Sequence, residues 1–355
     1  MRKVLLRLVY EHFWQVRPVG NELHVGIGWL YVLWMVVAFV CALILWRKTR
    51  SISEVCVSLG FWSLIPAGLI LTGLTDSEIV QHGIPVFGYG FMMFVGFSAG
   101  TLLAVHHAKY IGMDPAVIMD LMMWLLIPGL VGARLFYVCQ YPDRIFGLPD
   151  RNPLWSLMAL WDGGLVFYGA VIGGAFGGWI FCRRRKIRPL LLGDVVAPSL
   201  LIGSGFGRIG CFLYGCCYGG ACSLPWAVRF PPDSLTYQVQ LNTGVIQSGA
   251  VSTTSLHPTQ IYSSLLAFCL AGFLTWCFRR RKFEGFVVGL TFTMYPINRF
   301  LIEFIRNDEQ GQLGTSLTIS QWISIALFTG GITMLVWLSK TNDSFQVNKR
   351  NTQPG

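Results

Sequence analysis

The segment Gly207–Gly220 reads GRIGCFLYGCCYGG and places one arginine, three cysteines and five glycines at the end of a long apolar run. An arginine stays charged when it is partly dry, and it offers a planar fork of donors to phosphate oxygens. Thiols can form disulfides, bind metal ions or attack as thiolates. Glycines let the backbone approach a bound group closely. The segment therefore indicates anion chemistry at Arg208, thiol chemistry at the cysteines, or both.

A second group of ionisable residues lies in the apolar segment NRFLIEFIRNDE. Arg299 and Glu303 are four residues apart, so on a helix they share one face and can form an ion pair. One interpretation is a buried ion pair that ties helices together. The other is a phosphate site built from Arg208, Arg299 and Arg306, which are all predicted close to the outer leaflet. In a membrane, the available phosphate is that of a phospholipid head group.

Four cysteines follow the pattern C-x4-C-C-x4-C, at Cys211, Cys216, Cys217 and Cys222. One or two disulfides that staple an external loop are favoured, because an oxidising compartment supports them. A reactive thiol is the second interpretation, if Arg208 lowers a thiol pKa. A metal site has less support, because there is no C-x2-C pair and the nearest histidine in the sequence is the distant His257. We therefore expect no metal and no cofactor.

The composition indicates that an integral membrane protein must position these side chains. Of the 355 residues, 54% are hydrophobic and only 12% are charged, whereas soluble domains carry about 25% charged residues. The formal net charge of +10 lies mainly in short basic loops between apolar runs. We interpret these loops as contacts with anionic lipid heads and expect no nucleic-acid partner.

The apolar runs predict an all-α, polytopic membrane bundle. The expected spans are roughly residues 26–46, 55–75, 84–107, 116–139, 161–182, 190–213, 257–278, 284–305 and 317–338. The last seven would form the core. The basic loops RKTR, RRRKIR and RRRK are expected in the cytoplasm, although the basic residues of the first 17 positions favour an inside N-terminus. The Gly207–Gly220 segment would then lie outside, with residues 214–257 as a small external subdomain.

The motifs GARLFYV, GGLVFYGAVIGG, GFGRIGCFLYGCCYG, HPTQIY, NRFLIEFIR and LTISQWISI occur in an order that resembles the bacterial prolipoprotein diacylglyceryl transferases. The resemblance runs from about Gly83 to Leu338. It implies a seven-span core at 83–338, preceded by an extension at 1–80 with one or two spans and followed by a disordered cytoplasmic tail at 339–355. It also implies a multi-pass enzyme of the bacterial plasma (inner) membrane, with its active site facing the periplasm.

The resemblance implies an activity and its substrates. The family transfers the diacylglyceryl group of phosphatidylglycerol to the thiol of a lipobox cysteine in an exported prolipoprotein, giving a thioether and glycerol 1-phosphate. Arg208 matches the family's signature arginine, thought to hold the lipid phosphate. Arg299 matches a second essential arginine, with Glu303 and Arg306 as its neighbours. Further matches to substrate-site positions are Tyr89, Tyr295, His257, Pro258, Gln260 and Tyr262.

The chain departs from the family pattern at four positions. Tyr168 stands where the family has a histidine that is a candidate base. Cysteines replace a signature asparagine at Cys211, a nearby glutamate at Cys216 and the residue after it at Cys217. In the expected mechanism, Arg208 and Arg299 hold the lipid phosphate, and Tyr168 or His257 handles the thiol proton. Two alternatives remain at this point: a paralogue that binds phospholipid without thiol transfer, and a membrane thiol–disulfide protein that uses the external cysteines.

Overall fold

A computed structural model describes residues 4–9, 15–19, 22–26, 84–146, 164–306 and 314–351, together with four single residues between 29 and 39. The described residues fall into two units. One contains the N-terminal part up to Met93 and the segment Ile209–Leu256. The other contains Phe94–Arg208 and the chain from His257 onward, and it holds most of the long helices.

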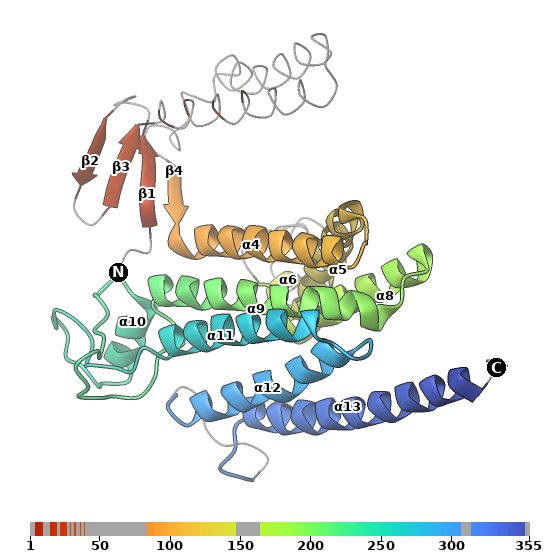
Figure 1. The fold of residues 1–355 in the computed structure, drawn as a ribbon. Helices are drawn as coiled ribbons and strands as arrows, with labels where there is room; N and C mark the ends of the chain where they lie inside the picture. Colours follow the sequence, from red (N-terminus) through yellow and green to blue (C-terminus); the bar gives the residue numbers. More distant parts are fainter. Residues whose placement is uncertain are drawn as a thin grey trace. The chain divides into compact units, whose positions relative to one another are not determined.

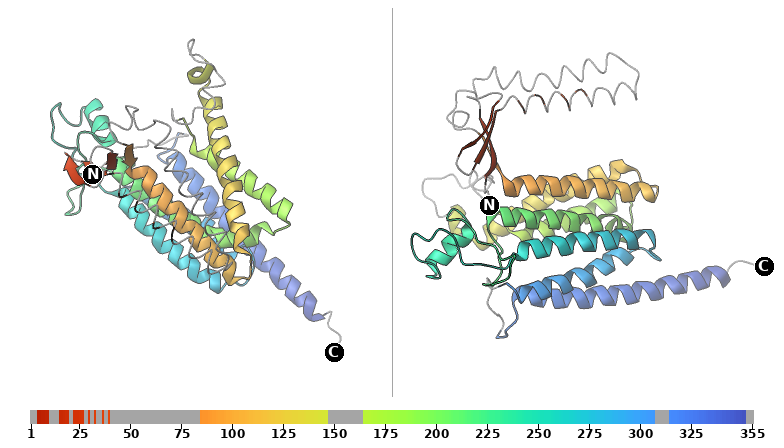
Figure 2. Two further views of the ribbon diagram at one scale, coloured as in Figure 1. Left: turned by 90° about the horizontal axis from the view of Figure 1, so that it is seen from above. Right: turned by 60° about the vertical axis from the view of Figure 1, so that its left-hand side comes forward.

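Seven long helices make up the predicted core, and they confirm the expected polytopic helical bundle. Their bounds are α4 Gly88–Tyr110, α5 Pro115–Gln140, α8 Phe167–Arg185, α9 Pro189–Tyr214, α11 Thr259–Arg279, α12 Phe286–Glu303 and α13 Ile319–Asn351. A short helix, α6 (Asp143–Phe146), follows α5. Five of the long helices, α4, α5, α9, α11 and α13, are also long and apolar enough to cross a membrane. Figures 1 and 2 show α4, α9 and α11 running side by side.

Local sequence signals explain where these helices begin and end. The carboxylate of Asp114 caps α5 by accepting a hydrogen bond from the backbone N–H of Ala116, and a proline follows at the first helical position. The helix α8 ends in three arginines, and Lys186 then adopts a left-handed conformation, with φ of 54°. Between α8 and α9 the chain therefore turns within a few basic residues.

Close packing of α5 on α8 depends on glycines, as the small-residue pattern of α8 predicts. A Cβ at Gly173 would lie 2.1 Å from the carbonyl oxygen of Pro128, and one at Gly132 would lie 2.4 Å from that of Gly169. Backbone therefore meets backbone along this interface. The buried core beside it includes Leu121 and Phe181 from the same two helices.

The N-terminal unit contains a four-stranded sheet, which the all-helical prediction omitted. Its strands are β1 Val4–Val9, β2 Val16–Val19, β3 Glu22–Gly26 and β4 Ile84–Phe87, in the order β2-β3-β1-β4. The strand β1 pairs in parallel with β3 and antiparallel with β4. The helix predicted from residue 84 therefore begins only at Gly88. Arg7 and Arg17, which complicated the predicted orientation, lie in this sheet.

Other N-terminal predictions cannot be compared with the structure. The expected spans at 26–46 and 55–75 lie outside the described residues, apart from isolated positions.

At the other end of the chain, α13 continues to Asn351, where the sequence predicted a disordered tail from residue 339. The tail carries no proline or glycine before residue 354 that would stop the helix.

Residues 215–256 fold around buried side chains; that residues 214–257 form an external subdomain stays a prediction. Phe230 is fully buried in this segment, and the helix α10 (Leu235–Asn242) packs beside it. The side-chain amide of Gln240 donates to the hydroxyl of Thr254 at 2.9 Å and accepts from its backbone N–H at 3.0 Å. The hydroxyl of Tyr237 donates to the carbonyl of Ala250. These bonds hold the irregular segment that leads back into α11.

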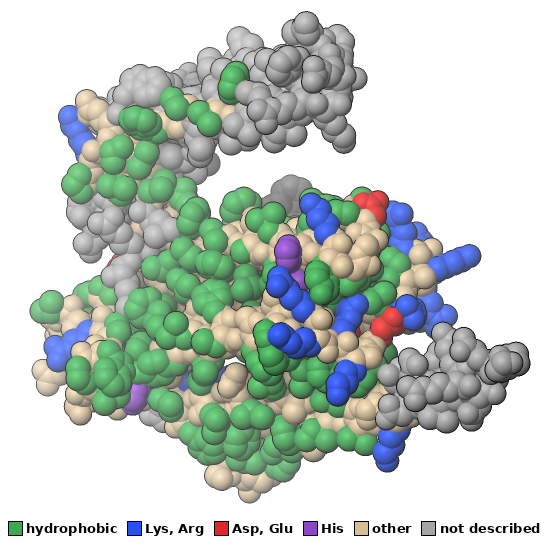
Figure 3. Space-filling model, viewed as in Figure 1, with side chains coloured by type: hydrophobic (Ala, Val, Ile, Leu, Met, Phe, Trp, Pro, Cys, Tyr) green, Lys and Arg blue, Asp and Glu red, His purple; other side chains and the backbone are tan. Residues whose placement is uncertain are grey.

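The surface of the helical unit is divided by side-chain type. Hydrophobic side chains cover the flank of the long helices, and lysines and arginines gather at one end (Figure 3). The last turns of α8 and α11 supply this basic end, with Arg183, Arg184, Arg185 and Arg279. Such a distribution suits helices surrounded by lipid.

Candidate functional site

A narrow cavity of about 30 Å³ lies between α9, α11 and α12, within the helical unit. Two predicted arginines line it: Arg208 from α9 and Arg299 from α12. Tyr295 lies one turn before Arg299 and also lines the cavity. The remaining lining residues are Ser204, Ser263, Leu266, Ala267, Leu270, Asn298 and Ile302. The cavity therefore combines an apolar wall from α11 with a polar, cationic wall from α9 and α12.

The predicted pair of Arg299 and Glu303 is formed. The Nη1 of Arg299 makes an ion pair with Oε2 of Glu303, whose side chain is only 1% exposed. The Nη2 of Arg299 donates to the hydroxyl of Ser320 at 2.8 Å. Because two partners hold the guanidinium from two helices, its orientation at the cavity is fixed.

The N-terminal turn of α13 completes the surroundings of Glu303. The hydroxyl of Thr318 donates to Oε1 of Glu303 at 3.2 Å, and the backbone N–H of Thr318 donates to the side chain of Gln321 at 2.9 Å. A buried carboxylate needs such donors, because burial without partners is costly. Thr318, Ser320 and Gln321 belong to the LTISQW motif, and sequence reasoning named none of them individually.

The electrostatics of the cavity favour an anion. Arg208 and Arg306 are the like-charged neighbours of Arg299, and Glu303 is its acidic neighbour. Among the described residues, two further guanidinium groups and one carboxylate act on the charge of Arg299, which gives this part of the cavity positive charge. Such an arrangement can bind a phosphate and stabilise negative charge that develops on a leaving group.

The start of α12 is anchored by a buried carboxylate of α9. The carboxylate of Asp194, fully buried in α9, accepts hydrogen bonds from the backbone N–H groups of Gly285, Val287 and Val288 at 2.9–3.0 Å. A carboxylate at a helix N-terminus satisfies otherwise unpaired donors and complements the helix dipole. Asp194 therefore positions the helix that carries Arg299.

The HPTQIY segment leads into α11, which begins at Thr259. Its first residue is His257, whose ring lies edge-on to that of Tyr262, with the ring centroids 6.3 Å apart. The Nδ1 atom of His257 is buried and has no hydrogen-bond partner among the described residues. Gln260 is 1% exposed, three residues further on. A buried imidazole nitrogen of this kind can take a proton or a hydrogen bond from a bound substrate.

The segment before α8 is held by Arg134. The Nη1 of Arg134 donates to the carbonyl oxygen of Gly164 at 3.0 Å, and the guanidinium lies 5.5 Å from the ring centre of Tyr137. Gly164 has φ of 75°, which glycine adopts readily. Tyr168 lies in the first turn of α8, but its side chain is outside the described residues.

Tyr89 belongs to the N-terminal unit, so the structure does not group it with the cavity. It lies in the first turn of α4, and its ring is 3.0 Å from where a Cβ at Gly210 would lie. Close contact with the backbone of α9 therefore accounts for this glycine. The role of Tyr89 in substrate binding stays a prediction.

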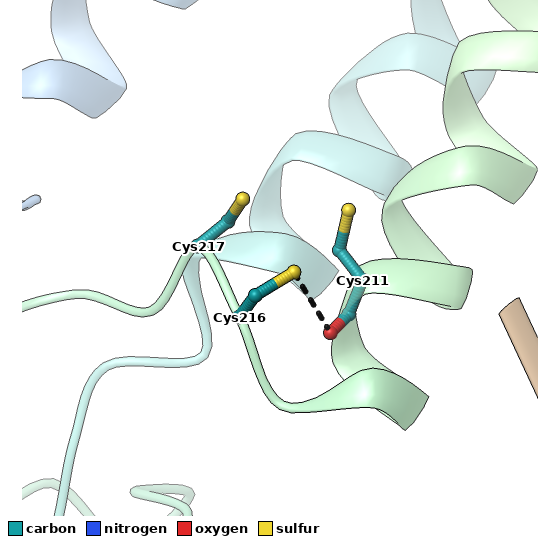
Figure 4. Close-up of side chains that lie close together, drawn as sticks. All are labelled: Cys211, Cys216 and Cys217. Atoms are coloured by element: carbon teal, nitrogen blue, oxygen red, sulfur yellow. Dashed lines mark hydrogen bonds between the residues drawn. The ribbon is translucent and has the colours of Figure 1, made fainter. Parts of the chain in front are cut away.

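Three of the four predicted cysteines come together at the end of α9, within the N-terminal unit. The sulfur atoms of Cys211, Cys216 and Cys217 all lie within 4.8 Å of one another (Figure 4). Cys222 is outside this group, and no disulfide joins cysteines in the described part of the chain. Hydrogen bonds with Cys211 and Cys217, together with burial, raise the pKa of the Cys216 thiol well above its usual range. A protonated thiol is a poor nucleophile.

Comparison with known proteins gives a consistent result. Residues 77–337 match the family model described as prolipoprotein diacylglyceryl transferase. The chain is 34% identical over 250 residues to phosphatidylglycerol–prolipoprotein diacylglyceryl transferase 2 of Clostridium perfringens, which covers 70% of this chain and 90% of that protein. It is 34% identical over 250 residues to the transferase of Clostridium tetani, with 70% and 92% coverage. A transferase of Rhodopirellula baltica is 27% identical, with 87% and 85% coverage.

Proposed function

The chain belongs to the prolipoprotein diacylglyceryl transferase family, and from this premise we propose that it transfers the diacylglyceryl group of phosphatidylglycerol to a cysteine thiol of a prolipoprotein. The observation that carries the assignment of the active site is the cavity lined by Arg208 and Arg299. We assign the acceptor to the lipobox cysteine that follows the signal peptide of an exported prolipoprotein.

The two arginines bind the phosphate of phosphatidylglycerol. Arg299 is oriented by Glu303 and Ser320, while Arg208 approaches from α9. Arg306, in the turn after α12, adds positive charge beside them. Leu266 and its neighbours on α11 give the cavity an apolar wall. Because the cavity of about 30 Å³ has room for about one water molecule, it must widen when the lipid head binds.

The chemistry is a substitution at carbon. The thiolate sulfur attacks the carbon of the diacylglyceryl group that is esterified to the phosphate. A carbon–sulfur bond forms, and the bond between that carbon and the phosphate oxygen breaks. Glycerol 1-phosphate leaves with the electron pair, and the arginines stabilise its added charge. The thiol proton must be removed first. We assign His257 as the base that accepts this proton, because its buried Nδ1 has no hydrogen-bond partner among the described residues. Tyr168 is the second candidate for this base.

The chain direction of the helices supports one orientation of the site in the membrane. α8 and α11 end at the basic side of the unit, whereas Arg208 and Arg299 lie near the opposite ends of α9 and α12. A basic end is retained in the cytoplasm. We propose that the protein is a multi-pass protein of the bacterial inner membrane whose cavity opens toward the periplasmic side.

The test combines complementation with a direct assay. A host depleted of its own transferase expresses the chain, and mass spectrometry measures the diacylglyceryl thioether on a lipoprotein cysteine. Arg208→Ala and Arg299→Ala are expected to lower the transfer rate by about 100-fold or more. The control is Arg188→Ala, because Arg188 is exposed and pairs with Glu284 away from the cavity. Full activity of Arg208→Ala would refute the phosphate assignment, and no product from membrane-inserted wild-type protein would refute the function.

A further inference from the structure

We propose that Cys211, Cys216 and Cys217 form a three-thiolate binding site for a soft d10 metal ion, Cu⁺ or Zn²⁺. The three sulfur atoms lie within 4.8 Å of one another. Two sulfurs that bind one zinc ion at about 2.3 Å are about 3.8 Å apart when the geometry is tetrahedral. Small rotations of the side chains therefore suffice to bring all three onto one ion.

The end of α9 explains why these cysteines meet although their spacing lacks a C-x2-C pair. The helix ends at Tyr214, and Gly215 follows in the left-handed conformation with φ of 79°. The carbonyl oxygen of Cys211 then accepts hydrogen bonds from the backbone N–H groups of both Gly215 and Cys216. When a helix ends this way, the residue two positions past its end folds back against its last turn. In this chain the residue past the end is Cys216, and the residue of the last turn that it meets is Cys211.

The turn is held in place from the other side by the folded subdomain. The hydroxyl and the backbone N–H of Thr236 both donate to the carbonyl of Gly215, at 2.7 and 3.1 Å. A Cβ at Gly215 would lie 2.9 Å from the Cβ of Ser234. The thiols of Cys211 and Cys216 are therefore presented by a fixed backbone, which lowers the cost of ordering the ligands when an ion binds.

Cys217 provides a second observation. Its φ of 60° is one of only two positive values at non-glycine residues in the described part of the chain. This conformation destabilises residues with a Cβ, and such strain commonly marks functional positions. Figure 4 shows that the resulting turn carries the Cys217 side chain to the same group as Cys216 and Cys211. A glycine would adopt this backbone conformation more readily than a cysteine. We therefore infer that the thiol of Cys217 is the reason for a cysteine at this position.

The chemistry of the ligands selects the class of ion. Thiolates are soft and prefer Cu⁺ and Zn²⁺ over magnesium, calcium or manganese. Among the described residues, no fourth histidine, cysteine or carboxylate joins the group. Three sulfurs alone suit a trigonal Cu⁺ ion, whereas Zn²⁺ would need a water molecule as its fourth ligand. In either case the ion replaces the three thiol protons, which pass to solvent.

The experiment measures retained metal rather than transferase activity. The full-length chain is purified in detergent under anaerobic, reducing conditions, loaded with Cu⁺ or Zn²⁺, desalted, and analysed for metal and protein. We expect about one retained ion per chain in the wild type and at least a tenfold loss of retained metal in Cys211→Ser and Cys216→Ser. X-ray absorption then separates the two ions, with three sulfur neighbours for Cu⁺ and three sulfurs plus one oxygen for Zn²⁺.

Two further variants keep the test independent of folding. Cys217→Gly relieves the left-handed backbone, so it should remain folded while it loses the ion. Cys222→Ser is the matched control, because Cys222 lies in the same subdomain outside the thiol group and should retain the ion fully. The proposal is overturned if reduced wild-type protein retains neither ion, if Cys211→Ser or Cys217→Gly binds as well as wild type, or if peptide mapping finds these cysteines joined as disulfides after isolation from the membrane.

Discussion

Arg299 forms an ion pair with Glu303, one turn further along α12, and the carboxylate of that pair is almost completely buried. The pair explains how a guanidinium can be kept at one orientation beside an apolar cavity. It also explains why a carboxylate is present where an anionic lipid head is expected to bind. Among the described residues, Arg208 and Arg306 are further positive neighbours of Arg299 beside this pair.

Replacement of Glu303 by glutamine tests this positioning role. Glu303→Gln keeps the size of the side chain and an acceptor for Thr318, but it removes the charge that orients Arg299. We expect kcat to fall by about 10- to 100-fold, because a small displacement of a catalytic group is costly, while KM for phosphatidylglycerol changes little. Steady-state kinetics in detergent micelles measures both constants. A rise in KM at unchanged kcat would contradict the assignment.

The cap on α12 gives a prediction about stability. Asp194→Asn removes the charge that accepts three backbone hydrogen bonds at the start of α12, and we expect a loss of about 2 kcal/mol. Asp120→Asn is the matched control, because Asp120 pairs with Arg185 at the exposed surface and such pairs contribute about 0–1 kcal/mol. Thermal unfolding of both variants in the same detergent makes the comparison. Equal losses would show that the cap on α12 does not set its stability.

The helical core was predictable because each helix is a long apolar run bounded by basic or turn residues. The four short strands were not, since segments of only four to six residues fit a strand and a fragment of a helix equally well. For the same reason the start of α4 was placed at residue 84 rather than at Gly88. The pairing partner of β4 lies some 80 residues earlier in the chain, and no local pattern reveals it.

The candidate site divides in a similar way. The pairing of Arg299 with Glu303 follows from a spacing of four residues on one helix. The contacts of Ser320 and Thr318 do not, because they depend on how α13 packs on α12. The thiol group at Cys211 depends on the left-handed turn at Gly215. The spacing of the cysteines in the sequence does not reveal this turn, so the sequence analysis favoured a disulfide over a metal site at these cysteines.

The interface between α5 and α8 permits a sharp comparison of two neighbouring glycines. A Cβ at Gly173 would lie 2.1 Å from the carbonyl oxygen of Pro128, whereas one at Gly174 would meet nothing closer than 3.6 Å. Gly173→Ala should therefore force the helices apart and cost about 1–3 kcal/mol. Gly174→Ala should be neutral or slightly stabilising, because alanine favours a helix. Thermal unfolding and the yield of membrane-inserted protein report the difference; similar behaviour of the two variants would contradict the packing.

The proposed orientation predicts which side of the membrane exposes each connecting segment. Val251 lies in the 215–256 subdomain and is 88% exposed, and Lys282 is exposed in the turn between α11 and α12. In spheroplasts, a membrane-impermeant maleimide should label Val251→Cys above the level of the unsubstituted chain and should leave Lys282→Cys at that level. After the membrane is permeabilised, both should react, since burial then protects neither. Labelling of Lys282→Cys alone in sealed spheroplasts would show that the orientation is reversed. The arginine cavity would then lie nearer the cytoplasm. Prolipoproteins on that side have not yet been exported, so the proposed acceptor cysteine would not reach the cavity.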